Sequence, residues 1–207
     1  MNHHPPAIFI ADSPGLDFLN SVATPVDTPV DWIADGEGLL DWLGQAKYVT
    51  TTVLNEIKMR AKPDELDKVA DEARALREWS RGFVRKHMGR PLPPGGLREL
   101  EPLNKLLAQD EAFNQIHHHR DEDGDRLELH TSRRWRSAQS LLLPIGERLA
   151  QFICEENFSD VKACEGASCR LLFADHTRRR ARRWCSMAIC GNRAKQAAHR
   201  ERLKNQR

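Results

Sequence analysis

The stretch Cys164-Glu165-Gly166-Ala167-Ser168-Cys169 and the later stretch Cys185-Ser186-Met187-Ala188-Ile189-Cys190 decide how the C-terminal part of this chain folds. Thiolates are negatively charged and repel one another at close range unless a metal ion neutralises them. Two close pairs separated by a short loop are a common way to build a tetrahedral zinc site. We therefore predict that Cys164, Cys169, Cys185 and Cys190 bind one structural Zn²⁺, with an iron–sulfur cluster as the main alternative.

The charge of the chain is divided unevenly. Its 207 residues carry a net charge of only +2. From Lys162 onward there are 13 Lys and Arg against 3 Asp and Glu, a net charge of +10, whereas the preceding part has 19 against 27, a net charge of −8. Such asymmetry suggests different partners for the two parts. We predict two domains, residues 1–160 and residues 161–207, of which only the second suits a polyanion.

The composition also bears on location. No apolar run approaches the length of a membrane span, and the start of the chain, Met1-Asn2-His3-His4-Pro5-Pro6, lacks the basic residues and apolar stretch of a secretory signal. Four of the five cysteines lie in close pairs, which favours reduced thiols that hold a metal over a disulfide framework. We expect a cytoplasmic protein that does not contact a membrane.

Residues 1–160 are predicted to form a mostly helical α+β domain with a small β component. The clearest helix begins after Pro63 and ends before Gly89, because apolar residues recur there at three- and four-residue spacing with charges between them. Residues 112–131 favour a β-hairpin. The other expected elements are helices at 39–43, 51–61, 97–107 and 137–156 (the last kinked at Pro144 or starting later), a loop at 24–31, and either two strands or a helix within 7–20.

Residues 161–207 are predicted to form a treble-clef zinc finger. A metal-binding turn at Cys164 to Cys169 leads into a short strand at 171–173 and a turn at 175–177. From Gly191 the chain is expected to be helical to its end, so that the start of this helix supplies the last metal ligand. A unit of this size cannot bury a core of its own, so metal binding is expected to supply much of its folding free energy.

Two motifs resemble known families. Arg182-Arg183-Trp184-Cys185-Ser186-Met187, followed by Cys190-Gly191-Asn192-Arg193-Ala194-Lys195, resembles the CGNR zinc-finger family, and Leu16-Asp17-Phe18-Leu19-Asn20 resembles the opening of the ABATE domain that its members carry. The resemblance implies a stress-linked transcription regulator, with a treble-clef finger and an N-terminal domain that binds a small ligand near Asn20. The run Arg178-Arg179-Arg180 differs from the family pattern, in which Asn or Gly often occupies this turn. The three arginines add positive charge to the turn and are not expected to disturb the metal site.

The basic segment contains the candidate nucleic-acid contacts. On the expected C-terminal helix, Arg193, Gln196, Arg200 and Lys204 share one face, and we predict that the first three read bases. The phosphate-binding candidates are Arg178, Arg179, Arg180, Arg182 and Arg183, and Lys195 is a further nucleic-acid-binding candidate. An equal alternative for Arg193 is a hydrogen bond to a metal-bound thiolate. We expect Ala194, Ala198 and Leu203 to form an apolar edge toward the finger, Trp184 to fill its small core, and Arg182 or Arg183 to pair with body carboxylates as an alternative to phosphate.

Three classes of function therefore compete. The leading prediction is a DNA-binding regulator, for which a homodimer is an expected form because a lone finger seldom binds tightly. The second is a module that docks on an acidic protein or on the acidic body of the chain itself. The third is RNA binding, which the charge pattern suits equally. The sequence contains no nucleophile elbow, P-loop or dinucleotide fingerprint, so we do not expect an enzyme.

Other residues suggest sites that we do not expect to exist. His117-His118-His119 lie in the predicted hairpin, where consecutive side chains point to opposite faces and cannot all reach one ion. The acidic run 121–125 lacks the spacing of a calcium loop and is expected to be a turn. Cys154 is expected to face the core as a small inert side chain.

Overall fold

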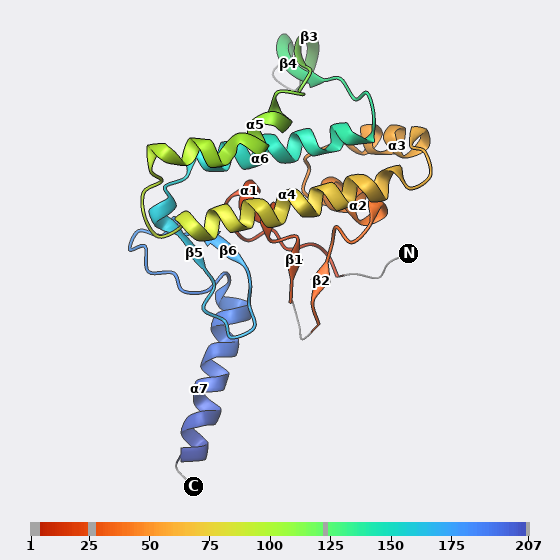
Figure 1. The fold of residues 1–207 in the computed structure, drawn as a ribbon. Helices are drawn as coiled ribbons and strands as arrows, with labels where there is room; N and C mark the ends of the chain where they lie inside the picture. Colours follow the sequence, from red (N-terminus) through yellow and green to blue (C-terminus); the bar gives the residue numbers. More distant parts are fainter. Residues whose placement is uncertain (1–4, 25–27, 122–123, 206–207) are drawn as a thin grey trace.

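The computed structural model describes residues 5–24, 28–121 and 124–205 (Figure 1). Within these residues, no helix is both long and apolar enough to cross a lipid bilayer. Six helices build the body. They are α1 (Pro14–Leu19), α2 (Gly36–Gln45), α3 (Thr51–Arg60), α4 (Glu65–His87), α5 (Glu101–Leu107) and α6 (Leu142–Glu155). The predicted fold class, a mostly helical α+β body followed by a zinc finger, is confirmed.

The first helix organises the core of the body. α1 packs against α6 and α4, while α2 packs on α4 and α5 packs on α6 (Figure 1). Phe18 of α1, Trp42 of α2 and Leu149 of α6 are fully buried in this core. Gly15 allows the close approach of α1 to α6, because a Cβ there would lie 2.6 Å from the Cβ of Phe152. Of the two alternatives for residues 7–20, the structure therefore contains the helix.

A short strand pair flanks the expected loop at 24–31, and its second strand occupies the last two residues of that loop. β1 (Val22–Ala23) pairs with β2 (Val30–Asp31) in antiparallel register. Arg77, which is 3% exposed on α4, holds β2 against the body through two hydrogen bonds to the Asp31 carboxylate, at 2.8 and 2.6 Å, and also donates to the hydroxyl of Ser21 at 3.0 Å. The sequence pattern does not show this pairing, because it depends on a buried arginine from a distant helix.

The long helix and the last body helix follow the predicted pattern, with the later start of the last helix as the alternative that the structure contains and with one correction, at Cys154. α4 buries Val69, Ala73 and Val84 and ends before Gly89, whose φ of +79° suits glycine. A 3₁₀ turn, η2 (Ala138–Leu141), precedes α6, so Pro144 lies in the first turn of a helix that starts later than 137. Cys154 is exposed on α6 and does not face the core. The two further 3₁₀ turns are η1 (Pro94–Leu100) and η3 (Phe158–Asp160).

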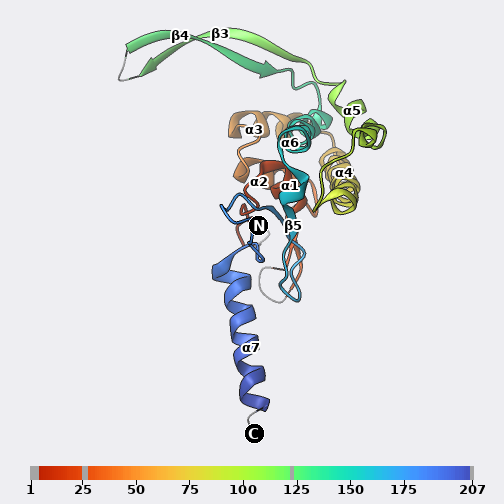
Figure 2. The ribbon, with the colours of Figure 1, turned by 90° about the vertical axis from the view of Figure 1, so that its left-hand side faces the viewer.

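The predicted hairpin is present and is longer than expected. β3 (Ala112–Asp121) and β4 (Gly124–Arg133) pair in antiparallel register and project from the body as an arm (Figure 2). Ile116 and Leu129 face each other across the ladder, and Leu127 lies on the same side; all three are more than 70% exposed. The alternation of Leu127 and Leu129 therefore marks an apolar face that no described residue covers. Residues 122 and 123 of the predicted acidic turn lie outside the described residues.

The finger begins as part of the body core. β5 (Val161–Ala163) pairs with β6 (Leu172–Ala174), and the first cysteine pair lies in the turn between them. All of β6 is buried, with Leu172 and Phe173 at 0% exposure in the same hydrophobic cluster as α1 and α6. A π-helical turn, η4 (Met187–Gly191), then leads into α7 (Asn192–Asn205), which runs away from the body (Figures 1 and 2).

Two buried side chains of the body bind the finger backbone. The amide of Asn20, which is 1% exposed, donates to the carbonyl of Leu172 at 2.7 Å and accepts from the Leu172 N–H at 2.9 Å. Arg81, on α4, donates to the carbonyl of Arg170 at 3.2 Å and to that of Leu19. These bonds satisfy backbone groups that burial would otherwise leave unpaired. The finger up to β6 is thus joined to the body, and only α7 stands free of it.

Replacing Asn20 by Ala tests this joint. The change leaves the N–H and the carbonyl of Leu172 buried without partners, so we expect a loss of about 2–4 kcal/mol in the free energy of unfolding. The measurement is urea unfolding followed by circular dichroism. Asn104→Ala, at an exposed position of α5, is the control and should change stability little. Equal midpoints for the two variants would contradict the structural role of Asn20.

Candidate metal centre and nucleic-acid interface

The four predicted cysteines converge on one point. The Sγ atoms of Cys164, Cys169, Cys185 and Cys190 all lie within 4.8 Å of one another. Cys185 Sγ is 3.8 Å from Cys169 Sγ and 3.6 Å from Cys190 Sγ. A tetrahedral Zn²⁺ with bonds of about 2.3 Å requires sulfur–sulfur distances of about 3.8 Å. The donor set and its spacing therefore fit one structural zinc ion.

The backbone around the cysteines shapes this cage. The N–H of Cys169 bonds the carbonyl of Gly166 at 2.9 Å, and the N–H of Cys185 points at Cys164 Sγ at 3.3 Å, as expected of a donor to a thiolate. A Cβ on Gly166 would lie 3.2 Å from Cys190 Sγ, so any other residue there would crowd the sulfur. Ser186 caps the π-helical turn that carries Cys190, with its hydroxyl 3.4 Å from the N–H of Ile189.

The thiols cannot all ionise without a cation. The hydrogen bond from Cys185 lowers the pKa of Cys169 to about 5. The same bond, together with burial, raises the pKa of Cys185, and burial and then the charge of Cys169 raise the pKa of Cys190 to about 12. One thiolate therefore forms readily at neutral pH, and it suppresses ionisation of its neighbours. A bound divalent cation removes this conflict because metal binding displaces the remaining protons.

A buried carboxylate organises the arginine-rich turn that follows β6. Asp175 is fully buried and accepts from Lys162 Nζ at 2.7 Å, from the hydroxyl of Thr177 at 2.6 Å and from the N–H of Arg182 at 2.9 Å. Burial opposes its charge, but these hydrogen bonds hold the pKa of Asp175 well below its usual range. Sequence reasoning missed this residue. The sequence offers one sign of its role, because Asp175 is one of only three acidic residues among the many basic ones from Lys162 onward.

Three of the arginines predicted to bind phosphate are engaged within the protein. Arg182 pairs with Asp12 of the body, donates to the Ile10 carbonyl at 3.1 Å and lies over the Phe173 ring at 4.4 Å. Its other hydrogen bonds go to the carbonyls of Trp184 and Cys185. Arg182 therefore joins the body to the finger. Its pair with Asp12 agrees with the alternative prediction, in which Arg182 or Arg183 binds a carboxylate of the body. Arg182 could bind a nucleic acid only if these bonds broke.

Arg180 and Arg183 are engaged in the same way. Arg180 adopts a φ of +48°, contacts Asp160 at 3.3 Å and donates to the Asp175 carbonyl. Arg183 pairs with Glu165 within the finger, with Nε 2.6 Å from the carboxylate. Its guanidinium also lies 5.0 Å from the ring of Trp184, which is half-buried against the core, as predicted.

Arg178 and Arg179 differ from the other arginines of the turn. Both side chains are exposed. Neither forms a hydrogen bond or an ion pair with any residue that the structure describes. They remain available to a phosphate, whereas Arg180, Arg182 and Arg183 contribute first to the fold.

The C-terminal helix that was predicted to contact bases, α7, is exposed along its length. From Asn192 to Lys204, every side chain of α7 is exposed except that of Ala194, which is half-buried. Arg193, Gln196, Arg200 and Lys204 project from one side of this helix by its 100° step. Lys195 lies on the opposite side. The expected apolar edge toward the finger is wrong beyond Ala194, because Ala198 is exposed and Leu203 is 50% exposed where α7 leaves the molecule.

The structure gives Asn20 a role other than the expected one. Its side chain is buried and bonds the backbone of Leu172 through both amide atoms. A ligand cannot reach it without separating α1 from β6. We therefore replace the expected ligand role of Asn20 by the structural role described above.

Removing the metal should destabilise the body as well as the finger. Cys169→Ser breaks the cage and loosens the turn that holds β6, whose Leu172 and Phe173 complete the body core. We expect the melting temperature of the helices, followed by circular dichroism, to fall by roughly 10 °C, and a chelator to act in the same way. Cys154→Ser, at an exposed position, is the matched control and should leave metal content and melting unchanged. Unaltered melting of the Cys169 variant would show that the finger folds separately.

Comparison with known families assigns both parts of the chain. Residues 12–156 match the ABATE family model, described as "Putative stress-induced transcription regulator", and residues 161–203 match the CGNR zinc finger. A comparison with curated proteins finds no match. The first match spans more than half of the chain, and the second contains all four clustered cysteines. The chain therefore belongs to the ABATE family and carries a CGNR zinc finger that fits one structural zinc ion.

Proposed function

We propose that this protein is a transcription regulator that binds DNA through α7. The observation that carries the proposal is the exposure of a basic helix whose base is fixed by a metal ligand, since Cys190 lies two residues before Asn192. A helix that is polar all round gains little from folding against its own protein. The major groove of DNA is about 12 Å wide and admits one α-helix, and the 14 residues of α7 span about 21 Å.

The side chains of α7 suit the two kinds of DNA contact. Arg pairs with guanine and Gln with adenine through two hydrogen bonds each, which supports Arg193, Gln196 and Arg200 as base-reading residues. We assign Lys195 and Lys204, with Arg178 and Arg179 of the turn, to phosphate contacts. If these four side chains neutralise about four phosphates, the logarithm of the affinity should fall against the logarithm of the salt concentration with a slope of about −3.6.

A helix of this length reads only a few base pairs. We propose that two copies bind together on a site with two-fold symmetry, because a dimer doubles the contacts that one finger offers. RNA binding and docking on an acidic protein use the same charges and remain the competing functions. Docking of α7 on the body of its own chain has no support, because the helix runs away from the body (Figures 1 and 2).

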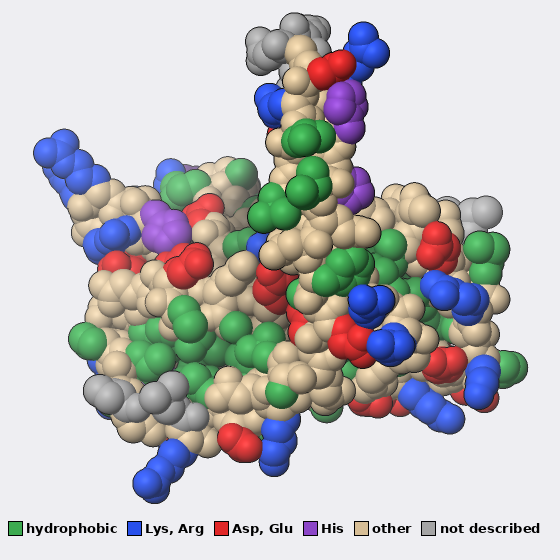
Figure 3. All heavy atoms as spheres, turned by 90° about the horizontal axis from the view of Figure 1, so that it is seen from above, with side chains coloured by type: hydrophobic (Ala, Val, Ile, Leu, Met, Phe, Trp, Pro, Cys, Tyr) green, Lys and Arg blue, Asp and Glu red, His purple; other side chains and the backbone are tan. Residues whose placement is uncertain are grey.

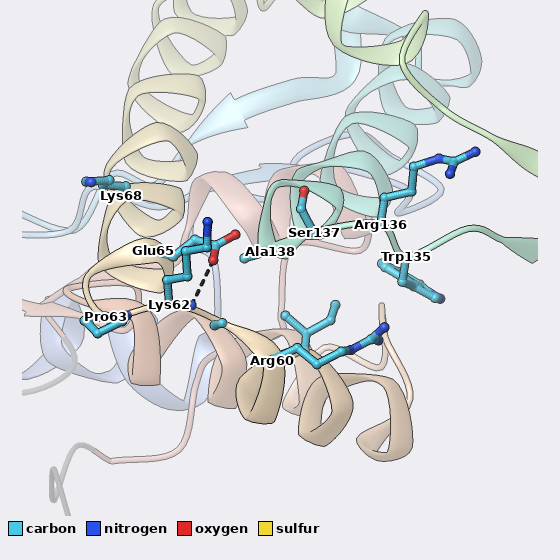
Figure 4. Close-up of a pocket in the computed structure, with 11 residues that line it drawn as sticks. Arg60, Lys62, Pro63, Glu65, Lys68, Trp135, Arg136, Ser137 and Ala138 are labelled. Carbon is cyan, nitrogen blue, oxygen red and sulfur yellow. Dashed lines mark hydrogen bonds between the residues drawn. The ribbon is translucent and has the colours of Figure 1, made fainter.

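We propose further that the body senses a small organic anion in a cavity of about 440 Å³ between the end of α3, the start of α4 and residues 135–138. Figure 4 shows Lys62 and Glu65 on one side of this cavity and Arg60 and Trp135 on the other. Ile57 and Ala138 add an apolar floor. This combination suits a flat apolar group with an acidic substituent.

The charges of the cavity favour an anion over a cation. Arg60, Lys62, Lys68 and Arg136 line it together with a single acidic residue, Glu65. Arg136 is held by two hydrogen bonds to Glu111, and Glu65 accepts from the N–H of Lys62 at 2.9 Å. The ammonium groups of Lys62 and Lys68 form no ion pair with any described residue. Binding an anion would therefore break no existing salt bridge of these two lysines.

The DNA proposal is tested by separating the two kinds of contact. Fluorescence anisotropy with a duplex selected from random sequence should show that Arg178→Gln with Arg179→Gln weakens binding to all sequences and reduces the salt slope by about 2. Arg200→Ala should cost about 1–3 kcal/mol on the selected site and little on random duplex. Arg98→Gln, at an exposed position of η1, is the control. Equal or tighter binding to single-stranded RNA or to polyglutamate would favour the competing functions.

The ligand proposal is tested with benzoate and its neutral analogue benzamide. Benzoate should quench tryptophan fluorescence and raise the melting temperature of the wild-type chain more than benzamide does, because only benzoate carries the charge that Lys62 and Arg60 attract. Lys62→Gln should reduce the effect severalfold, whereas Lys105→Gln, on exposed α5, should not. Identical responses to the two compounds would contradict an anion site.

A further inference from the structure

The projecting hairpin has two chemically different faces. The register pairs Ile116 with Leu129 and His118 with Leu127, so these four side chains share one face. It also pairs His117 with Glu128, His119 with Arg126 and Gln115 with His130 on the other face. Figure 3 shows the arm from above, with hydrophobic side chains along one side and histidines along the other. The function proposed above uses neither face.

Four potential metal ligands gather on the second face. His130 Nε2 lies 3.0 Å from Glu128 Oε2, and His119 Nδ1 lies 3.7 Å from the same oxygen. The ring of His117 is 5.1 Å from that of His130, centroid to centroid. The sequence motif of three histidines had suggested no site because its members alternate. The register places Glu128 and His130 of the second strand on the same face as His117 and His119.

The carboxylate in this cluster is already oriented. Arg126 Nε donates to Glu128 Oε1 at 2.6 Å, whereas the two histidines approach Oε2. A metal ion on Oε2 would therefore leave the Arg126 bond intact, and Arg126 would act as an outer partner that fixes the ligand. The side chains of His119 and His130 are 44% and 50% exposed, so an ion can reach both rings from the solvent.

The chemistry of the donors selects the ion. Imidazole nitrogen with one carboxylate oxygen suits Zn²⁺ and similar transition metals, whereas Ca²⁺ and Mg²⁺ prefer oxygen ligands alone. Two histidines and one Glu supply three ligands of a tetrahedral zinc site and leave a fourth position, which a third histidine or a water can occupy. A cross-strand metal would have a structural effect too, because a two-stranded hairpin without cover is only marginally stable in water.

We propose that the hairpin is a second metal site, in which His119, His130 and Glu128, with His117 as a fourth ligand, bind Zn²⁺. The site is separate from the four-cysteine centre in both position and ligand type. It differs from it in affinity as well, because its ligands are exposed and must reorient. Zinc is expected to exchange at the hairpin while the cysteine-bound ion stays in place.

The test counts zinc on the full chain. Every protein is prepared without an affinity tag and with His3→Gln and His4→Gln, so that imidazoles at the start of the chain do not contribute. Protein whose cysteine site is filled is titrated with Zn²⁺ by calorimetry, and bound zinc is measured by elemental analysis. The expected result is a second equivalent of zinc, with an affinity that falls at least tenfold in His119→Gln and in His130→Gln.

His118→Gln is the matched control, because it removes the same ring from the same strand on the opposite face. It should bind the second zinc like the parent protein. Retention of the first zinc and of the circular dichroism spectrum in each variant shows that the fold is intact. A single equivalent of zinc in the parent protein, or an equal loss of affinity in His118→Gln, would overturn the proposal.

Discussion

Four thiolates held at one point by one cation fix the geometry of the C-terminal part of this protein. The first pair lies in the turn between β5 and β6, so it ties the metal to the body core through the buried strand β6. The second pair spans the approach to α7, so it ties the same metal to the helix. The direction of α7 is therefore set by the cage and not by packing, because the helix buries almost none of its own surface. Without the cation, no bond would hold the two cysteine pairs together, so both connections would loosen at once.

The basic character of the finger is divided between structure and surface. Asp175 gathers Lys162 and the backbone of Arg182, and the pairs Arg182–Asp12 and Arg180–Asp160 place positive side chains against acidic ones that precede the finger. The charge nearest the body is thereby neutralised. Arg178 and Arg179 form no ion pair with any described residue, and α7 carries its basic side chains away from the body (Figure 1). An acidic body that repels a polyanion and a distal helix that attracts it would together orient DNA toward the end of the molecule.

The sequence predicted the parts of the protein that depend on local chemistry. The cysteine spacing identified the metal ligands, the apolar period identified α4, and the alternation at Leu127 and Leu129 identified the hairpin. It did not predict the partners of Arg81 and Asn20, because the backbone groups that these buried side chains bind lie 62 and 152 positions away in the chain. The exposure of Cys154 escaped prediction for a related reason, since one position of helical phase separates a core-facing side chain from an exposed one.

The long helix α4 offers a physical route between the proposed ligand cavity and the finger. Glu65 and Lys68 at its start line the cavity, and Arg81, four turns further along, bonds the carbonyl of Arg170 beside the first cysteine pair. The helix is continuous for 23 residues, or about 34 Å, and its interior arginines Arg77 and Arg81 are anchored at both strand β2 and the finger. A ligand that shifts the start of α4 would therefore move a side chain that holds the finger backbone. Coupling by this route requires that the ligand favour one position of α4 over another, because equal affinity for both positions would shift nothing.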